Sequence, residues 1–133
     1  MPAIEVSDED IQSAFETNVF SVIQIVRELS PLIIRAKGKI VNIGSITAVT
    51  PYVFGAVYNA TKGALQAYSN TLRLELAPFG VRVILVVTGG VQSRIARTDR
   101  TLSEDSLYLP ISADYLRRVK HSQGEIRSVV SAS

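Results

Sequence analysis

The chain has 133 residues, of which 47% are hydrophobic, and this is enough for one domain with a core of its own. Its 14 basic and 12 acidic residues are scattered and leave a net charge of +2, which favours neither nucleic acid nor an anionic membrane as a partner. Without cysteine there are no disulfides or cysteine-ligated metals, and no apolar run approaches the ~18 residues that span a bilayer. We therefore expect a cytoplasmic protein with no membrane span and no metal site.

The first helix is predicted to begin just after Ser7. Ser7 is a favourable N-cap residue, and Asp10 follows three residues later, in the manner of a capping box. Pro31 is expected to kink the helix near its end, and Gly38 to stop it. The sequence between these signals is predicted to be helical because apolar residues recur at a helical period, at Ile11, Phe15, Val19, Val22, Val26 and Leu29.

Two short apolar segments are predicted to be strands, with a second helix between them. Residues 39–44 are rich in β-branched side chains, and a helix over about 55–77 ends before Pro78 and Gly80. Residues 81–87 are almost continuously apolar, which is typical of a strand buried on both faces. The order helix, strand, helix, strand favours parallel pairing, so we predict an α/β fold with a small parallel sheet and long helices.

The pattern weakens after Gly89 and Gly90. Residues 98–133 are polar and irregular, with one short helix expected at about 113–121 and a mobile end from residue 124. We therefore predict a folded portion at 1–97 and a partly mobile C-terminal extension at 98–133. Two strands are few for a doubly wound sheet, so either the sheet is very small or another chain covers its exposed edge.

Tyr58 and Lys62 lie four residues apart on the second predicted helix, so their side chains share one face. A tyrosine hydroxyl, with an ordinary pKa of about 10, is a poor proton shuttle at neutral pH, and an adjacent ammonium lowers that pKa by favouring the phenolate. Such a pair is weak evidence by itself, because any helix produces a surface tyrosine near a surface lysine by chance.

Two further polar residues strengthen this interpretation. Ser45 directly follows the first predicted strand, and ligands collect at the carboxyl ends of parallel strands. Its hydroxyl is therefore placed to bond a carbonyl oxygen while Tyr58 supplies a proton. Asn18 lies on the apolar stripe of the first helix, where a buried amide needs a partner. That partner is either a backbone group or a structural water, or else a water that connects Lys62 to solvent as a proton relay.

These residues and their surroundings resemble the Asn–Ser–Tyr–Lys tetrad of the short-chain dehydrogenase/reductase superfamily. Asn18 lies in Phe-Glu-Thr-Asn-Val-Phe, Ser45 ends Ile-Val-Asn-Ile-Gly-Ser, and Tyr58 and Lys62 lie in Tyr-Asn-Ala-Thr-Lys-Gly-Ala. The 13-residue separation of Ser45 and Tyr58 and the segment 72–83 match the family pattern as well. Segments 87–91 and 105–111 are most similar to fungal reductases of the acyl-dihydroxyacetone-phosphate reductase type, which implies NADPH-dependent reduction of a lipid-like ketone.

The resemblance implies a role for each member of the tetrad. Ser45 would orient the substrate carbonyl and Tyr58 would protonate it. Lys62 would lower the pKa of Tyr58 and bind the nicotinamide ribose, and Asn18 would support the water relay. Tyr58 and Lys62 thereby contribute to cofactor binding together with the family's nicotinamide loop, which is expected here at Thr88, Gly89, Val91 and Ser93.

The chain departs from the family pattern at its beginning. The family's glycine-rich turn, which places the pyrophosphate at a helix N-terminus, has no counterpart in this sequence. We therefore expect a truncated Rossmann-like fold that lacks the N-terminal nucleotide-binding βαβ units and binds the nucleotide weakly. In the nicotinamide loop, Thr88 also replaces the family proline, and Ser93 replaces threonine but keeps a hydroxyl.

Three functions remain open at this point. The first is a truncated oxidoreductase that acts on a small carbonyl or hydroxyl compound with NADP(H). The second is a cofactor-independent acid–base enzyme (a cyclase, isomerase or dehydratase) that reuses Tyr58, Lys62 and Ser45. The third is a non-catalytic interaction protein. The resemblance also implies a homodimer formed through the two long helices, and the balanced charge gives no reason to expect a nucleic-acid partner.

Overall fold

The computed structural model describes residues 1–89 and 101–123, which divide into two compact units. One unit comprises Pro2–Thr88, and the other comprises Met1 with Gly89–Ser133. In the second unit a short turn, η5 (Leu109–Ile111), leads into α4 (Ser112–Gln123), so the helix predicted at about 113–121 is confirmed. The predicted domain boundary at residue 97 and the end of the chain from residue 124 lie outside the described residues.

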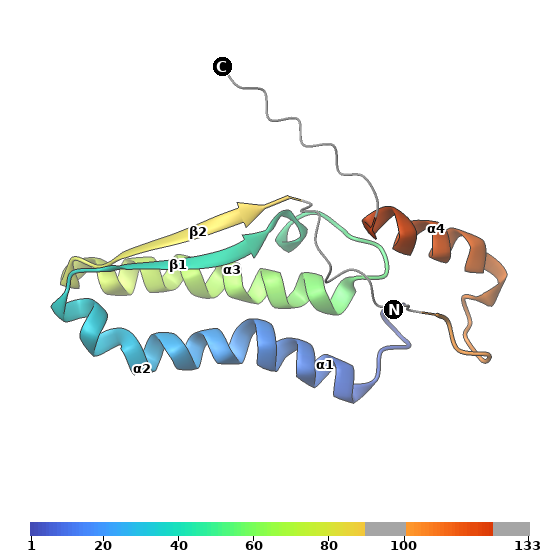
Figure 1. The fold of residues 1–133 in the computed structure, drawn as a ribbon, viewed down its shortest axis with the longest axis horizontal. Helices are drawn as coiled ribbons and strands as arrows, with labels where there is room; N and C mark the ends of the chain where they lie inside the picture. Colours follow the sequence, from blue (N-terminus) through green and yellow to red (C-terminus); the bar gives the residue numbers. More distant parts are fainter. Residues whose placement is uncertain (90–100, 124–133) are drawn as a thin grey trace, which may run out of the picture. The chain divides into compact units, whose positions relative to one another are not determined.

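The first predicted helix is confirmed, with an interruption that the sequence pattern did not predict. It consists of α1 (Asp8–Phe15), a π-helical turn η1 (Glu16–Phe20) and α2 (Ser21–Arg35), which follow one another directly (Figure 1). The N-cap is as expected, because the Ser7 hydroxyl accepts a hydrogen bond from the Asp10 amide at 3.1 Å. The π turn shifts the register of the helix around its centre, as such turns often do at functional sites.

The end of this helix differs from the prediction. Pro31 lies within α2, and the Arg27 carbonyl that it leaves without an amide partner accepts from the Ser30 hydroxyl at 2.9 Å. Gly38 does not supply the left-handed residue, because Lys37 does so with φ of 47°. The Gly38 amide then donates back to a carbonyl of the last turn at 2.9 Å, which completes a Schellman-type ending around a lysine.

The sheet has two parallel strands, β1 (Lys39–Ser45) and β2 (Arg82–Thr88), joined through α3 (Ala56–Leu76). The register pairs Ser45 with Thr88, so both strands end at the same edge of the sheet. After α3, the turn η3 (Ala77–Phe79) leads to the sharp bend into β2. The predicted α/β fold with a small parallel sheet and long helices is therefore confirmed.

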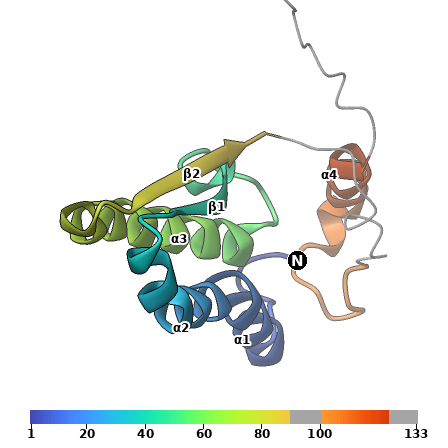
Figure 2. The ribbon, with the colours of Figure 1, turned by 60° about the vertical axis from the view of Figure 1, so that its left-hand side comes forward.

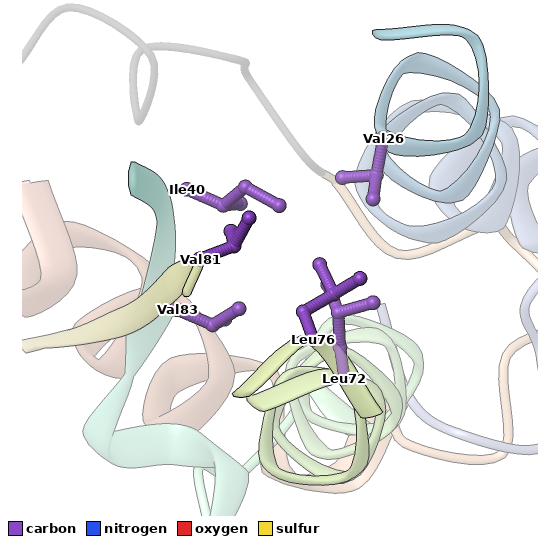
Figure 3. Packing of buried hydrophobic residues seen from close by; sticks show 6 residues of the cluster. All are labelled: Val26, Ile40, Leu72, Leu76, Val81 and Val83. Atoms are coloured by element: carbon purple, nitrogen blue, oxygen red, sulfur yellow. The ribbon is translucent and has the colours of Figure 1, made fainter. Parts of the chain in front are cut away.

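All the helices of this unit lie on one side of the sheet. In Figures 1 and 2, α3 runs beneath β1 and β2, and the helix formed by α1 and α2 runs beside α3 on the same side. Burial of each large aliphatic side chain between these layers contributes about 1.5–3 kcal/mol. The side chains that converge between the layers form the core shown in Figure 3: Val26, Ile40, Leu72, Leu76, Val81 and Val83.

The other face of the sheet is apolar and exposed. Ile84 and Val86 on β2 are 41% and 40% exposed, and Val41 and Ile43 on β1 are more exposed still. The expectation that residues 81–87 are buried on both faces is therefore wrong for this chain. The reason is that α3 and α2 cover one face, and no described element of Pro2–Thr88 covers the other.

The helix over Asp8–Arg35 carries many apolar residues that are not buried in the core. By length and composition alone this 28-residue helix is long and apolar enough to cross a membrane, since an 18-residue stretch of it has a mean hydropathy of 1.2. Val19 and Val26 of this helix are nevertheless buried within the folded unit. The exposed large apolar residues of this helix are Ile11, Phe20, Ile23, Ile25, Leu29 and Leu32.

Candidate active site

The candidate site lies at the carboxyl ends of the two strands. Ser45 is the last residue of β1 and is only 6% exposed. Its oxygen accepts from the Thr47 amide at 3.2 Å and from the Thr47 hydroxyl at 3.0 Å, within the turn η2 (Ile46–Ala48). These two bonds fix the serine oxygen at the end of the strand.

Tyr58 and Lys62 come from the first turns of α3, as predicted, and the structure brings them together. The Lys62 ammonium lies 5.7 Å from the centre of the Tyr58 ring, and the Tyr58 side chain is 44% exposed. Lys62 also donates to the backbone carbonyl of Ile43 on β1, at 2.9 Å. Partial burial lowers the pKa of Lys62 below its ordinary value, because desolvation disfavours the charged form.

Asn18 is connected to this site through Thr61. It lies in the π turn η1, and its amide nitrogen donates to the Thr61 hydroxyl at 3.1 Å. Thr61 is fully buried, and its hydroxyl donates in turn to the Tyr58 carbonyl at 2.7 Å. The partner of the Asn18 amide nitrogen is thus a side chain, and this partner ties the first helix to the backbone of Tyr58.

Thr61 is a site residue that the sequence reasoning missed, and a usable signal for it existed. Thr61 and Ser69 are polar residues on the buried stripe of α3, where they alternate with Leu65 and Leu72. Both are hydrogen-bonded, since Ser69 accepts from the buried Asn42 amide at 2.9 Å. A polar residue on an apolar stripe had already identified Asn18, and the same test applied to α3 identifies Thr61.

The predicted nicotinamide loop is described only in part. Thr88 ends β2, and its hydroxyl donates to the Gly44 carbonyl at 3.0 Å, which holds the two strand ends together. Gly89 follows it, and a side chain there would meet open space. Val91 and Ser93 lie outside the described residues.

Comparison with known proteins decides the family. The model of the short chain dehydrogenase family matches residues 1–103. The chain belongs to this family. The α/β arrangement is therefore that of a short-chain dehydrogenase.

Several fungal short-chain dehydrogenases are similar to the chain. It is 47% identical over 121 residues to short-chain dehydrogenase fogD of Aspergillus ruber, covering 90% of this chain and 42% of that protein. It is 45% identical over 115 residues to the NADPH-dependent 1-acyldihydroxyacetone phosphate reductase of Schizosaccharomyces pombe, covering 82% of this chain and 39% of that protein. The predicted similarity to fungal reductases of this type is confirmed.

Solved short-chain dehydrogenases share the fold. A Streptomyces avermitilis enzyme matches with a TM-score of 0.74 and 27% identity, over 94% of this chain and 47% of that one. A Burkholderia cenocepacia enzyme in complex with NADP matches with a TM-score of 0.69 and 31% identity, over 77% of this chain and 44% of that one. The chain thus spans less than half the length of each of these relatives.

Proposed function

We propose that this chain carries the acid–base part of an NADP(H)-dependent oxidoreductase that reduces the ketone of a lipid-like substrate. The observation that carries the proposal is the contact of Lys62 with Tyr58, at the sheet edge where Ser45 ends β1. The substrate class is suggested by the similar reductase of Schizosaccharomyces pombe, whose name specifies an acylated dihydroxyacetone phosphate.

The described residues fit one end of the cofactor. Tyr58, Lys62 and Thr88 offer hydroxyl and ammonium groups near the carboxyl ends of the strands, which suits a nicotinamide ribose. No described glycine lies in a phosphate-binding loop, and Gly44 is packed so that a side chain there would meet Leu85 at 3.0 Å. The described residues therefore suit the nicotinamide end of the cofactor, and none of them forms a site for its pyrophosphate.

The chain's own residues would handle the proton. When bound, NADPH supplies the hydride to the carbonyl carbon of the substrate. Ser45 donates a hydrogen bond that orients the carbonyl oxygen, and Tyr58 transfers its hydroxyl proton to that oxygen as negative charge develops there. The Lys62 ammonium stabilises the phenolate left behind. Asn18 contributes indirectly, because its hydrogen bond to Thr61 helps to hold the backbone of Tyr58 in place.

A cofactor titration tests this proposal. If only the nicotinamide end is held, NADPH and reduced nicotinamide mononucleotide should bind with similar dissociation constants of about 1 mM. Chemical-shift perturbation of the labelled chain measures both constants, and Lys62→Met should weaken both by a similar factor. Binding of neither compound at several millimolar contradicts the proposal, and NADPH binding more than about tenfold tighter shows a phosphate site in the chain.

We also propose that the chain forms a homodimer through its long helices. Ile25, Leu29 and Leu32 share one face of α2 and are 56%, 45% and 60% exposed, which is costly unless another surface covers them. Light scattering is expected to give twice the 14.5 kDa mass of the chain. The double variant Ile25→Glu, Leu32→Glu should be monomeric, whereas Leu107→Glu, at a leucine of the other unit that is 76% exposed, should remain dimeric. A wild-type monomer contradicts this proposal.

A further inference from the structure

The Ser45 hydroxyl is held by two hydrogen bonds from a single residue. Its oxygen accepts from the Thr47 amide at 3.2 Å and from the Thr47 hydroxyl at 3.0 Å. A hydroxyl group has two lone pairs that accept and one hydrogen that it can donate. In this arrangement Thr47 therefore uses both lone pairs of Ser45, and the role left to the Ser45 hydroxyl is that of a donor.

The direction of these bonds matters to a ligand at the end of β1. Ser45 is only 6% exposed, and among the described residues its hydroxyl is bonded to Thr47 alone. Its hydrogen therefore either points at the Thr47 oxygen or is available to a ligand. A ketone oxygen offers only lone pairs, so it can bind Ser45 only when this hydrogen points outward. A bound ketone thus selects one chain of hydrogen bonds, from Thr47 to Ser45 to the ligand.

We propose that Thr47 is a positioning residue for ketone reduction, which orients the Ser45 hydroxyl as a donor and strengthens the hydrogen bond that Ser45 gives to the substrate oxygen. This inference rests on the proposed function, in which Ser45 orients the carbonyl and Tyr58 protonates it. A hydroxyl that accepts a hydrogen bond becomes a better donor, because successive hydrogen bonds polarise one another. The benefit grows as negative charge develops on the carbonyl oxygen, so it is larger in the transition state than in the bound ground state.

The backbone and the side chain of Thr47 can be tested separately. The amide of Thr47 bonds to Ser45 as part of the turn η2, in which Ser45 is the N-cap. Thr47→Val keeps this amide and the branched shape of the side chain and removes only the hydroxyl. Thr50→Val is the matched control, because it makes the same change at an exposed threonine just beyond the same turn.

Thr47→Val is expected to lower kcat for ketone reduction about fivefold to tenfold, the value of one hydrogen bond, and to change KM less than about twofold. Thr47→Ser keeps the hydroxyl and should bring kcat back to within about twofold of the wild-type value, where Thr50→Val should also lie. The thermal unfolding midpoint should be the same in all these variants, because the amide bond of the turn is kept. An unchanged or higher kcat in Thr47→Val overturns the proposal, since Ser45 would then give its hydrogen to Thr47 in competition with the substrate.

A titration without cofactor separates this proposal from the proposed function. The probe is cyclohexanone labelled with ¹³C at its carbonyl, and the parent protein is the full chain with Tyr58→Phe, which leaves Ser45 as the hydroxyl donor of the pair. A stronger hydrogen bond moves the carbonyl resonance of the bound ketone downfield. Adding Thr47→Val to this parent should therefore move the bound resonance upfield, and adding Thr47→Ser should not.

The two experiments fail in different ways. Equal bound resonances in the Tyr58→Phe parent and its Thr47→Val derivative overturn the role of Thr47, whatever the wild-type chain does with NADPH. Absence of NADPH-dependent ketone reduction by the wild-type chain overturns the proposed function, and the comparison of bound resonances still decides whether Thr47 strengthens the Ser45 donor.

Discussion

Tyr58→Phe is expected to lower kcat/KM for ketone reduction by about 10²–10⁴-fold, the usual loss when a general acid is removed. The substitution deletes one hydroxyl and keeps the ring that Lys62 contacts at 5.7 Å. The side chain is 44% exposed, so its loss leaves no buried group without a partner, and the thermal unfolding midpoint should not change. The rate of NADPH oxidation in the presence of a ketone measures the effect.

Tyr68→Phe provides the matched control on the same helix. Tyr68 packs against the core, and its pKa is raised first by burial and then by the negative charge of Glu75. It is therefore unsuited to proton transfer at neutral pH, and its replacement should leave kcat/KM within a factor of about two. Equal losses in the two variants would mean that Tyr58 is not the proton donor.

Leu72→Ala is expected to lower the free energy of unfolding by about 2–5 kcal/mol. Leu72 is 8% exposed and lies in the core between α3 and the sheet, together with Leu76 and Val83 (Figure 3). The substitution removes buried aliphatic surface and leaves a cavity. Since a small domain is stable by only about 5–15 kcal/mol, a substantial fraction of its stability should be lost.

Leu74→Ala is the control for this prediction, because it makes the same chemical change two residues along α3. Leu74 is 75% exposed, so its replacement should alter stability by less than about 0.5 kcal/mol. Urea unfolding followed by circular dichroism compares the two variants. Similar losses would show that Leu72 does not lie in the core that the structure assigns to it.

The main elements could be predicted because their signals are local. Ser7 caps the first helix with its own hydroxyl, and the alternation of helix and strand favours a parallel pair. The π turn around Asn18 could not be predicted, because it changes the register of the backbone while the apolar spacing remains helical. Glycine is the residue expected in the left-handed conformation at a helix end, yet Lys37 adopts that conformation here.

The candidate site was predictable in its residue types and less so in its contacts. Tyr58 and Lys62 follow from helical spacing, Ser45 from its place after a strand, and Asn18 from its place on an apolar stripe. The bond from Lys62 to Ile43 could not be foreseen, because a backbone carbonyl is present at every position and its direction depends on the strand register. Whether a face of the sheet is exposed likewise depends on whether a helix covers it. The apolar sequence of residues 81–87 does not show this.

Two cations of α3 reach the strands. Arg73 donates from its guanidinium to the Val83 carbonyl on β2 at 3.0 Å, and Lys62 donates to the Ile43 carbonyl on β1 at 2.9 Å. Partial burial lowers the pKa of Lys62, so its ammonium loses its charge at a pH where an ordinary lysine still holds it. As the pH rises, β1 therefore loses a charged group of the kind that discourages the pairing of further strands at an exposed edge. Alkali thus makes this side of the small sheet more open to unwanted pairing.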